Sequence, residues 1–282
     1  MAIGQRIFVF SVQFLRKVAS VLDKQMAESV SAELAEEMIP IITKTTKLGA
    51  IKFFCPGKVP VGRARSLLSK EPETIEWINT FTDNDIFWDI GANVGLYSLY
   101  AGLNPSLTIL SFEPSPANYY LLCRNLEINK MDNRISAYCL AFNDVSGLNT
   151  FYMQNTELGG ALNSFAESVD CEGNPFTASL KQAMIGFSID DFVKQFNPPF
   201  PNHIKIDVDG IENKIINGAK KTLSDERLKS FLIELDSNRK QYTDGVIQII
   251  KNAGLKFHVK KHCPRFDTGP YASIYNYIFV RA

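Results

Sequence analysis

Residues 86–97 read IFWDIGANVGLY, a hydrophobic strand that leads through a turn of small residues into a helix. Residues 86–90 are a short apolar run of the kind found in strands buried on both faces of a parallel sheet. Gly91 and Gly95 allow the backbone angles and the close ligand approach that such a turn needs. A ligand held here would lie at the helix N-terminus. We therefore predict a nucleotide-binding turn, with an ordinary tight connection as the alternative.

A second buried strand, Thr108 to Phe112, ends on Glu113-Pro114 and so places a carboxylate at its carboxyl end. Glu113 lies 22 residues beyond Gly91. An acidic residue at about this spacing binds ribose hydroxyls in dinucleotide folds. Glu113 is accordingly a predicted cofactor-binding residue.

The glycine spacing in the turn is G-x-x-x-G, and it distinguishes two classes of cofactor. A dinucleotide site favours a second glycine two residues after the first, where this chain has Asn93. S-adenosylmethionine has no phosphate and carries a sulfonium and an amino-acid tail, so the carboxylate of Asp89 suits it. Capping of the helix is the alternative role for Asp89. The predicted cofactor-binding residues of this turn are Asp89, Gly91, Asn93 and Gly95.

A third strand is predicted from Ile135 to Phe142, followed by Asn143 and Asp144. Either residue is placed where it would meet the edge of an adenine, and simple turn chemistry is the alternative. We expect residues 148–153 to pair with this region as a hairpin or sheet extension around Ser146-Gly147.

Residues 203–212 read HIKIDVDGIE, a buried strand with two acids at its carboxyl end. Ligands gather at the carboxyl ends of strands in an open α/β sheet. We therefore predict Asp207, Asp209 and Glu212 as catalytic residues, with helix capping as the alternative, and Asp207 as the first candidate for a proton acceptor or acceptor orienter. His203 begins the strand and is expected to be a surface histidine. Lys205 is expected to pair with Asp207 or with Glu234, on the next strand.

The chain resembles a known family in four motifs that occur in order: EPETIEWIN at 71–79, the turn at 89–95, FEPSP at 112–116 and IKIDVDGIE at 204–212. It is similar over residues 51–282 to the FkbM family of S-adenosylmethionine-dependent methyltransferases, which commonly has Glu where this chain has Asp209. The resemblance implies a Rossmann-like class I methyltransferase fold. It also implies O-methylation, often of sugars in polysaccharide, glycolipid or natural-product assembly.

The alternation of strands and helices predicts an α/β fold, a doubly wound and mostly parallel seven-stranded sheet with an N-terminal helical cap. Residues 255–260 and 275–280 are expected to be its closing pair of strands. We expect residues 1–50 to be a helical, amphipathic extension and residues 51–282 to be the S-adenosylmethionine-dependent methyltransferase domain. A second helix of the extension is predicted from Ala27 to Thr43.

The extension begins with an unusually apolar segment, residues 3–22, whose longest unbroken apolar run is Ile7 to Phe10. That run is far short of the ~20 residues that a spanning helix needs. Polar and basic residues interrupt it at helical spacing, which predicts an amphipathic helix. We expect its apolar face to pack on the domain or on a sister subunit, so that a homo-oligomer forms; peripheral membrane contact is the alternative.

The composition favours a cytoplasmic globular enzyme. The chain has 282 residues, and 30 basic side chains balance 30 acidic ones, so no net charge favours nucleic acid as a partner. Five scattered cysteines without a Cys-x-x-Cys pair predict reduced thiols and no zinc site. The partner we expect is a small-molecule or glycan acceptor. If residues 3–22 contact a membrane, the protein would lie peripherally at its inner face.

Two other functions use the same residues. A metal-dependent nucleotide-sugar transferase would hold a divalent cation between Asp207 and Asp209. A catalytically inactive, methyltransferase-like scaffold would bind a membrane through residues 3–22. We predict no metal site, and the pair His258-x-x-x-His262 has metal-like spacing only on a helix, whereas a strand is predicted there. The long irregular segment 155–187 is expected to cover the acceptor site. Three aromatic residues are candidates to stack on a sugar ring: Phe165, Phe176 and Tyr271.

Overall fold

The structure, a computed structural model, describes residues 3–170 and 172–281. The chain divides into two compact units, residues 1–40 and residues 41–282, and each is described by itself. The predicted boundary between residues 50 and 51 lies inside the second unit, in a hairpin of β1 (Ile41–Thr45) and β2 (Ala50–Phe54). Backbone pairing between these two strands holds residues 41–50 to the second unit.

The N-terminal unit contains two helices, α1 (Ile3–Leu22) and α2 (Lys24–Glu37). The carboxylate of Asp23 caps α2 by accepting a hydrogen bond from the backbone N–H of Met26 at 3.0 Å. The second helix was predicted to reach Thr43, and this is wrong, because α2 ends at Glu37 and residues 41–45 pair as β1. Several apolar side chains of α1 are exposed, including Phe10 at 68% and Leu15 at 65%. Within the described part of the chain, we find no helix that is both long and apolar enough to cross a membrane.

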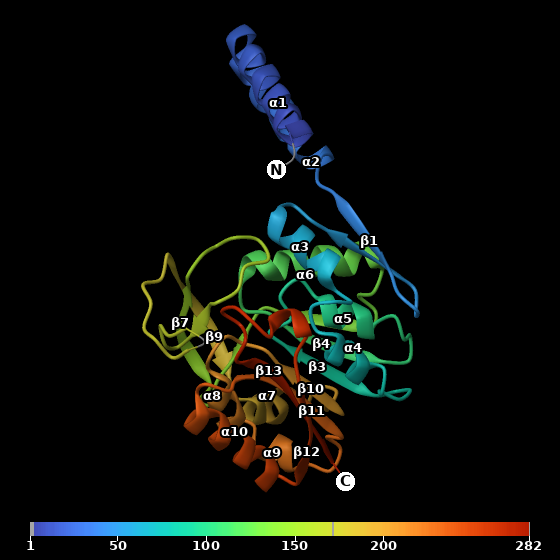
Figure 1. Ribbon diagram of the computed structural model, residues 1–282, viewed down its shortest axis with the longest axis vertical. Coiled ribbons are helices and arrows are strands. Elements are labelled where there is room, and N and C mark those ends of the chain that lie inside the picture. Colours follow the sequence, from blue (N-terminus) through green and yellow to red (C-terminus); the bar gives the residue numbers. More distant parts are fainter. Residues whose placement is uncertain (1–2, 171, 282) are drawn as a thin grey trace. The chain divides into compact units, whose positions relative to one another are not determined.

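The second unit is built on a seven-stranded sheet with the strand order β12-β13-β11-β10-β3-β4-β5 (Figure 1). Its strands are β3 (Ile86–Ile90), β4 (Thr108–Phe112), β5 (Ile135–Tyr138), β10 (His203–Ile206), β11 (Ser230–Asp236), β12 (Leu255–Lys261) and β13 (Ile274–Arg281). The pairs along β11-β10-β3-β4-β5 are parallel, and β13 lies antiparallel between β11 and β12. The order reverses beside β3, the strand that carries the Gly91 turn. The predicted Rossmann-like fold, with its mostly parallel seven-stranded sheet, is confirmed.

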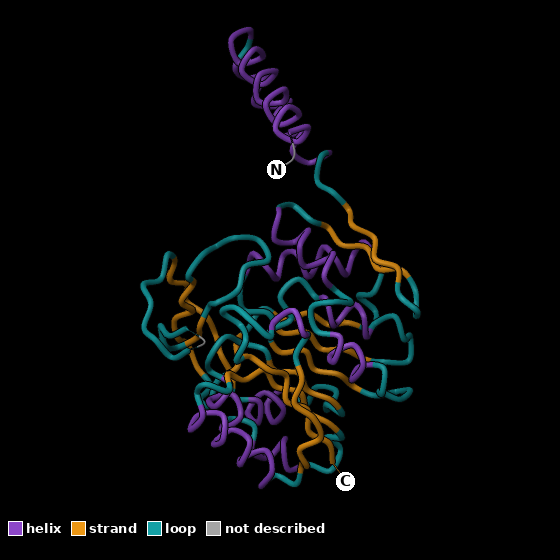
Figure 2. Tube along the Cα trace, in the orientation of Figure 1, coloured by secondary structure: helices purple, strands orange, loops and turns teal. Residues whose placement is uncertain are grey.

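Helices cover both faces of this sheet, as the layers in Figure 2 show. One face carries α4 (Pro72–Ile78), α5 (Leu96–Ala101) and α6 (Pro116–Asn129); the other carries α7 (Ile189–Phe196), α8 (Glu212–Asn217), α9 (Lys220–Ser224) and α10 (Lys240–Asn252). Successive residues of a strand point to opposite faces, so Phe87 joins one hydrophobic core and Trp88 the other. A further helix, α3 (Lys58–Ser66), follows the β1–β2 hairpin. The central strands, whose ends carry the site, are thus packed on both faces.

A smaller sheet has the order β6-β9-β7-β8 and comprises β6 (Ala141–Phe142), β7 (Gly147–Met153), β8 (Ser164–Phe165) and β9 (Leu180–Phe187). The expected pairing of residues 148–153 with the third strand is wrong. β7 instead pairs antiparallel with β9 over its whole length, and β6 pairs parallel with the end of β9. Part of the segment 155–187, predicted to be irregular, is thus regular strand. The cause is long-range: β9 supplies a longer partner than the two residues of β6 do.

His203 is buried, so its prediction as a surface histidine is wrong. It begins β10, a central strand, and its ring stacks on Phe81 with 3.8 Å between centroids. Its ring nitrogens lie 2.9 Å from Asp85 Oδ2 and 2.7 Å from Ser230 Oγ. Burial lowers the pKa of His203 to about 4, although the Asp85 carboxylate opposes this shift. The imidazole is therefore a neutral part of the core at neutral pH.

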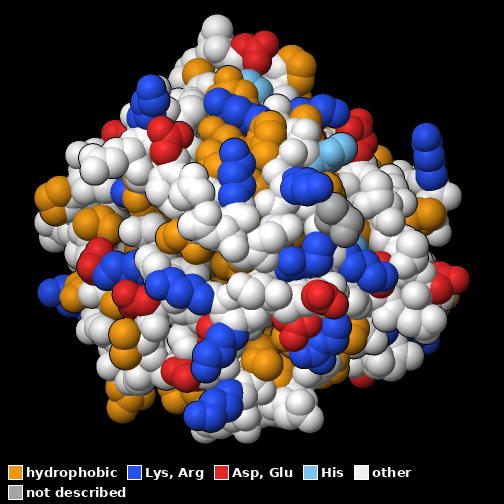
Figure 3. Space-filling view, turned by 90° about the horizontal axis from the view of Figure 1, so that it is seen from below, with side chains coloured by type: hydrophobic (Ala, Val, Ile, Leu, Met, Phe, Trp, Pro, Cys, Tyr) orange, Lys and Arg blue, Asp and Glu red, His pale blue; other side chains and the backbone are white. Residues whose placement is uncertain are grey.

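Charged side chains of both signs are interspersed on the face drawn in Figure 3. A protein that binds the phosphate backbone of a nucleic acid needs clustered Lys and Arg side chains to contact the phosphates. The mixed charges of this face agree with the balanced composition of the chain.

Candidate active site

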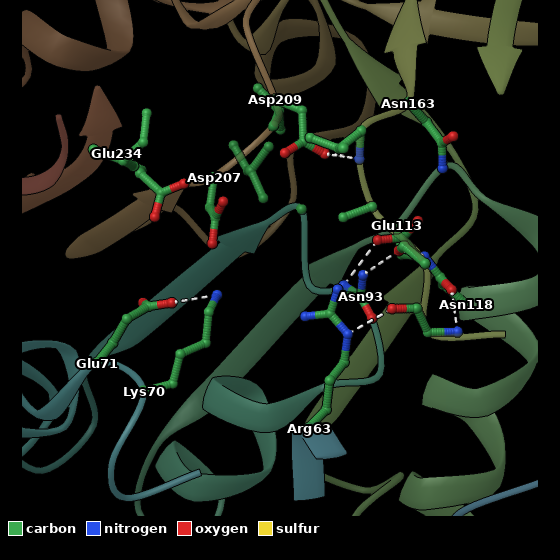
Figure 4. Close-up of a pocket in the computed structure, with 18 of the residues that line it drawn as sticks. Arg63, Lys70, Glu71, Asn93, Glu113, Asn118, Asn163, Asp207, Asp209 and Glu234 are labelled. Carbon is green, nitrogen blue, oxygen red and sulfur yellow. Dashed lines mark hydrogen bonds and ion pairs between the residues drawn. The ribbon is translucent and has the colours of Figure 1, made fainter. Parts of the chain in front are cut away.

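A cavity of about 720 Å³ lies at the carboxyl ends of the central strands (Figure 4). Residues that follow β3, β4, β10 and β11 meet there, as the topology of an open α/β sheet requires. Segments from outside the sheet complete the wall: α3, the loop before α4, residues 157–163 and the loop between β12 and β13. The cavity has a glycine-turn end and an acidic end.

The turn after β3 forms the first end. The backbone N–H groups of Gly91 and Ala92 both donate to Phe112 O, at 2.9 and 3.0 Å. Gly91 has a φ of 85°, and a Cβ built there would lie 1.9 Å from the carbonyl oxygen of Asp207. Only glycine fits between these two strand ends without moving one of them.

Glu113 joins the turn to the end of β4. Its Oε2 accepts a hydrogen bond from the Asn93 N–H, and its Oε1 accepts one from the Ser115 N–H, both at 2.8 Å. Burial raises the pKa of Glu113 to about 7, against the effect of these two donors. The side chain is thus a fixed, buried acceptor at the tip of its strand.

A turn at Gly159-Gly160 is held against this end of the cavity by three side chains. Asn118 makes two hydrogen bonds, accepting from Gly159 N–H at 2.9 Å and donating to Gly160 O at 3.0 Å. Asn93 Nδ2 also donates to Gly160 O, at 2.8 Å, and Arg63 Nε donates to Gly159 O at 2.6 Å. The segment 155–187 was expected to cover the acceptor site. Its Gly159-Gly160 turn forms part of the cavity wall at the glycine-turn end of the cavity.

Asn118→Ala should release this turn. The Gly159 N–H then loses its acceptor, and we expect its hydrogen exchange to become at least about tenfold faster. Amide exchange followed by NMR measures this, with the amides of β3 as the internal control. Unchanged exchange at Gly159 would show that Arg63 and Asn93 hold the turn without Asn118.

The acidic end contains Lys70 and several carboxylates (Figure 4), and the buried Lys205 lies against one of these carboxylates. Lys70 Nζ donates to Glu71 Oε1 at 2.8 Å, and the buried Lys205 Nζ donates to Asp207 Oδ2 at 2.6 Å. The predicted pairing of Lys205 with Asp207 is confirmed. Glu234 lies beside them, so that carboxylate oxygens of Glu71, Asp207 and Glu234 are within 4.8 Å of one another.

The charges at this end decide which acid is ionised. Burial alone would raise the pKa of Asp207, but the ammonium groups of Lys205 and Lys70 outweigh it and lower the value to about 2. Burial and the Asp207 charge together raise the pKa of Asp209 to about 6. They raise the pKa of Glu234 well above its ordinary value. Asp207 is therefore the ionised partner of Lys205 at neutral pH.

Five of the predicted site residues line the cavity: Gly91, Asn93, Glu113, Asp207 and Asp209. Asp209 has a φ of 48°, and its Oδ2 accepts a hydrogen bond from the Leu162 N–H at 2.6 Å. This bond ties the strap of residues 159–162 to the acidic end as well.

The other five predicted site residues are absent from the cavity wall: Asp89, Gly95, Asn143, Asp144 and Glu212. Asp89 is buried, with Oδ2 accepting from Ser98 Oγ at 2.5 Å. Glu212 begins α8 and accepts hydrogen bonds from the Gly210 N–H and from the Tyr242 hydroxyl, so its carboxylate is bound within the protein. In place of Asn143 and Asp144, the wall has the preceding residues 140–142.

Sequence reasoning missed much of the wall. The missed residues include Arg63, Lys70, Asn118, His262 and Asn276. Lys70 directly precedes the EPETIEWIN motif, and this position is the one feature of the sequence that could have marked it as a site residue. His262 Nδ1 donates to Ile274 O, and Nε2 lies 3.0 Å from Asp267 Oδ1; among the described residues, His262 belongs to no group of side chains that could hold a metal ion.

Comparison with known proteins gives one family and several relatives. The family described as the methyltransferase FkbM domain matches residues 89–257. Methyltransferase 1 of Beauveria bassiana (strain ARSEF 2860) is 32% identical over 153 residues, 49% of this chain and 59% of that protein. The 31-O-demethyl-FK506 methyltransferase FkbM of Streptomyces tacrolimicus is 33% identical over 79 residues, 27% of this chain and 30% of that protein.

The hexuronic acid methyltransferase AglP of Haloferax volcanii is 21% identical over 184 residues, 65% of this chain and 70% of that protein. The chain spans less than two thirds of the length of the Beauveria and Streptomyces relatives.

Proposed function

Since the chain belongs to the family of the methyltransferase FkbM domain, we propose that it transfers the methyl group of S-adenosylmethionine to a hydroxyl oxygen of a sugar or a natural-product intermediate. The observation that carries this proposal is one cavity that joins a glycine turn and a buried strand-end acid to a cluster of carboxylates, two of which are paired with lysines. When bound, S-adenosylmethionine supplies a methyl group on a positively charged sulfur.

An unpartnered atom at the glycine turn supports the choice of cofactor. Asn93 Oδ1 is buried and has no hydrogen-bond partner among the described residues, whereas Nδ2 of the same side chain is fixed on Gly160 O. A buried acceptor without a donor is costly, so a ligand that brings a donor would stabilise this site. The ammonium group of the cofactor's methionine part is such a donor.

The rest of this end suits an adenosine. Glu113 stands where strand-end acids bind ribose hydroxyls, as the spacing from Gly91 predicts. Leu140, Ala141 and Phe142 supply an apolar wall against which an adenine ring would pack. We therefore propose residues 140–142 for the adenine contact that the sequence placed at Asn143 or Asp144.

The acidic end suits both a cationic cofactor and an alcohol acceptor. Ionised carboxylates favour a positive sulfur nearby by Coulomb attraction, and Asp207 stays ionised. Alignment of the acceptor oxygen with the methyl group accounts for much of the rate in such displacements. We propose that Asp207, held by Lys205, orients the acceptor, with Asp209 and Glu212 supporting the loops around it.

Two relatives support the acceptor class. One is named for hexuronic acid and the other for an oxygen of FK506. At the rim of the cavity, Phe266 and Tyr271 meet edge to face with 6.3 Å between ring centroids. Aromatic rings in this position would stack on the apolar face of a sugar. Phe165, the other stacking candidate on the wall, is a buried core residue.

The proposal extends to where the enzyme acts. We place it in the cytoplasm, with residues 3–22 contacting a sister subunit or the inner face of a membrane. The exposed Phe10, Phe14 and Leu15 of α1 support a partner of one of these kinds. Cross-linking in solution and flotation with anionic liposomes distinguish the two.

Calorimetric titration with S-adenosylhomocysteine tests the cofactor. We expect binding at about micromolar Kd, no binding of NAD, and affinity at least about tenfold weaker in Glu113→Gln, which loses an acceptor for ribose. The exposed Asp83→Asn is the control and should bind like the wild type. A folded protein that binds NAD but not S-adenosylhomocysteine would overturn the proposed function.

A further inference from the structure

Three neighbouring strands place polar side chains in one row at the acidic end of the cavity. Glu234 of β11 lies directly opposite Asn276 of β13 in the antiparallel register. On its other side, β10 pairs with β11 up to Ile206–Ile233, so Asp207 follows next to Glu234. All three residues line the cavity. The row is made by strand order and register, and each strand contributes one residue to it.

Glu234 is the carboxylate of this row that the protein leaves open. Lys205 donates to Asp207, and Lys70 donates to Glu71. Lys70 and Lys205 act on the Glu234 carboxylate as nearby charges, but no residue of 3–170 or 172–281 forms a hydrogen bond or ion pair with it, and Figure 4 shows it beside Asp207 without a dashed line. Both ammonium groups are thus used by the neighbouring acids.

Asn276 adds a second open acceptor next to Glu234. The side chain is only 2% exposed, and its Nδ2 donates to Glu73 Oε1 at 2.8 Å, which fixes its orientation. Its Oδ1 is buried with no partner among the described residues. Two adjacent acceptors without donors call for a ligand that carries donors.

The neighbouring lysines favour a hydroxyl ligand over a divalent cation. The ammonium groups of Lys70 and Lys205 are bonded to Glu71 and Asp207, the other two acids of the cluster. A divalent cation held between these acids would be repelled by both ammonium charges at short range. A neutral hydroxyl group meets no such repulsion and supplies the missing donor.

We infer that Glu234 is the catalytic proton acceptor: its carboxylate binds the reacting hydroxyl of the acceptor and takes up the proton during methyl transfer. This inference rests on the proposed function and gives Asp207 the separate task of orienting. The acceptor oxygen forms a bond to the methyl carbon, and the carbon–sulfur bond breaks with its electron pair left on sulfur. The hydroxyl proton passes to Glu234. Charge balances, because the sulfonium becomes neutral as the carboxylate becomes a carboxylic acid.

The electrostatics of the cluster fit this role. Burial, Asp207 and Glu71 raise the pKa of Glu234, and Lys70 and Lys205 oppose them. A carboxylate with a raised pKa is a better proton acceptor once it is ionised. A positively charged ligand in the cavity favours the ionised form, so a cationic cofactor would prepare the group that receives the proton.

The test uses two cofactor analogues and needs no acceptor. Sinefungin carries an ammonium group on the carbon that replaces the methylated sulfur, whereas S-adenosylhomocysteine is uncharged at this point. We expect the wild type to bind sinefungin about tenfold more tightly than S-adenosylhomocysteine, because the ammonium group lies among the carboxylates. Glu234→Gln should lose at least about threefold of this preference, with the remainder due to the ionised Asp207, and should keep its affinity for S-adenosylhomocysteine. Calorimetry at one pH gives all four Kd values.

Asp236→Asn is the matched control. Asp236 lies two residues further along β11 on the same face, accepts from the Asn238 N–H at 2.8 Å, and is absent from the wall of this cavity. We expect it to keep the wild-type preference. A preference for sinefungin that is unchanged in Glu234→Gln would overturn the inference. Binding of Mn²⁺ by the wild type that is abolished in Glu234→Gln would also overturn it, because the cluster would then be a cation site.

Two further results keep the outcomes separate. If the wild type binds neither analogue, the proposed function fails and not only the role of Glu234. If Glu234→Gln does not fold, the pH dependence of the wild type decides: the preference for sinefungin must rise with pH as Glu234 ionises among Asp207, Glu71, Lys70 and Lys205. A preference that stays flat with pH, while the ligand amine stays charged, would overturn the inference.

Discussion

Gly91→Ala should abolish measurable binding of S-adenosylhomocysteine. The new Cβ would lie 1.9 Å from Asp207 O, so the turn after β3 and the end of β10 would have to move apart. The positive φ of 85° adds about 1–2 kcal/mol of strain for a residue with a side chain. We expect affinity to fall more than about 100-fold and the free energy of unfolding to fall by about 2–4 kcal/mol. Calorimetry and urea unfolding measure the two effects.

Gly245→Ala provides the control for this substitution. Gly245 lies within α10, and a Cβ built there meets no atom within 4 Å. Alanine is the better helix former, so this variant should gain about 0.5–1 kcal/mol of stability and bind as the wild type does. Binding by Gly91→Ala within about threefold of the wild type would show that the two strand ends can separate without harm to the cofactor end.

Acidification should destabilise the wild type through His203 by about 2 kcal/mol between about pH 7.5 and pH 5. The pKa of His203 is lowered from 6.5 to about 4 by burial. A lowered pKa means that the unfolded chain binds this proton first. Stability is therefore full above pH 6.5 and falls as the pH drops toward 4. Urea unfolding at several pH values gives the slope.

Other groups titrate in the same range, so His203→Gln provides the comparison. The raised pKa values of Glu113 and Asp209 act in the opposite sense, because the folded protein binds those protons first. The expected quantity is thus the difference between wild type and variant: the variant should be less stable at pH 7.5 but lose about 2 kcal/mol less on acidification. Parallel stability curves would show that a charged imidazole is tolerated beside Asp85.

The cofactor end of the cavity was predictable in part because its information is local. The apolar strand, the turn at Gly91 and the acid at Glu113 lie in one βαβ unit, and the chain must bring them together once the strands are parallel. Asn93 and Glu113 are joined by a 2.8 Å hydrogen bond, as their places at adjacent strand ends require. Asp89 shows where this reasoning stops, because its side chain turns to Ser98 and away from the cavity wall.

The acidic end shows the opposite case. Lys70, Glu234 and Asn276 come from three distant parts of the chain, and no local pattern marks them as neighbours. The register of β11 against β13 puts Asn276 opposite Glu234, and the loop before α4 brings Lys70 to them. An unpaired carboxylate can be recognised only when every candidate partner has a position.

The sequence by itself determined the alternation of strands and helices, the parallel sheet, the turn at Gly91 and the acids at the ends of β4 and β10, because hydrophobic periodicity and glycine spacing act within a few residues. Only the tertiary structure decided the pairing of β7 with β9, the burial of His203 and the charge state of Asp207. Strand pairing, desolvation and Coulomb interaction depend on which distant residues meet, and a local pattern does not contain that information.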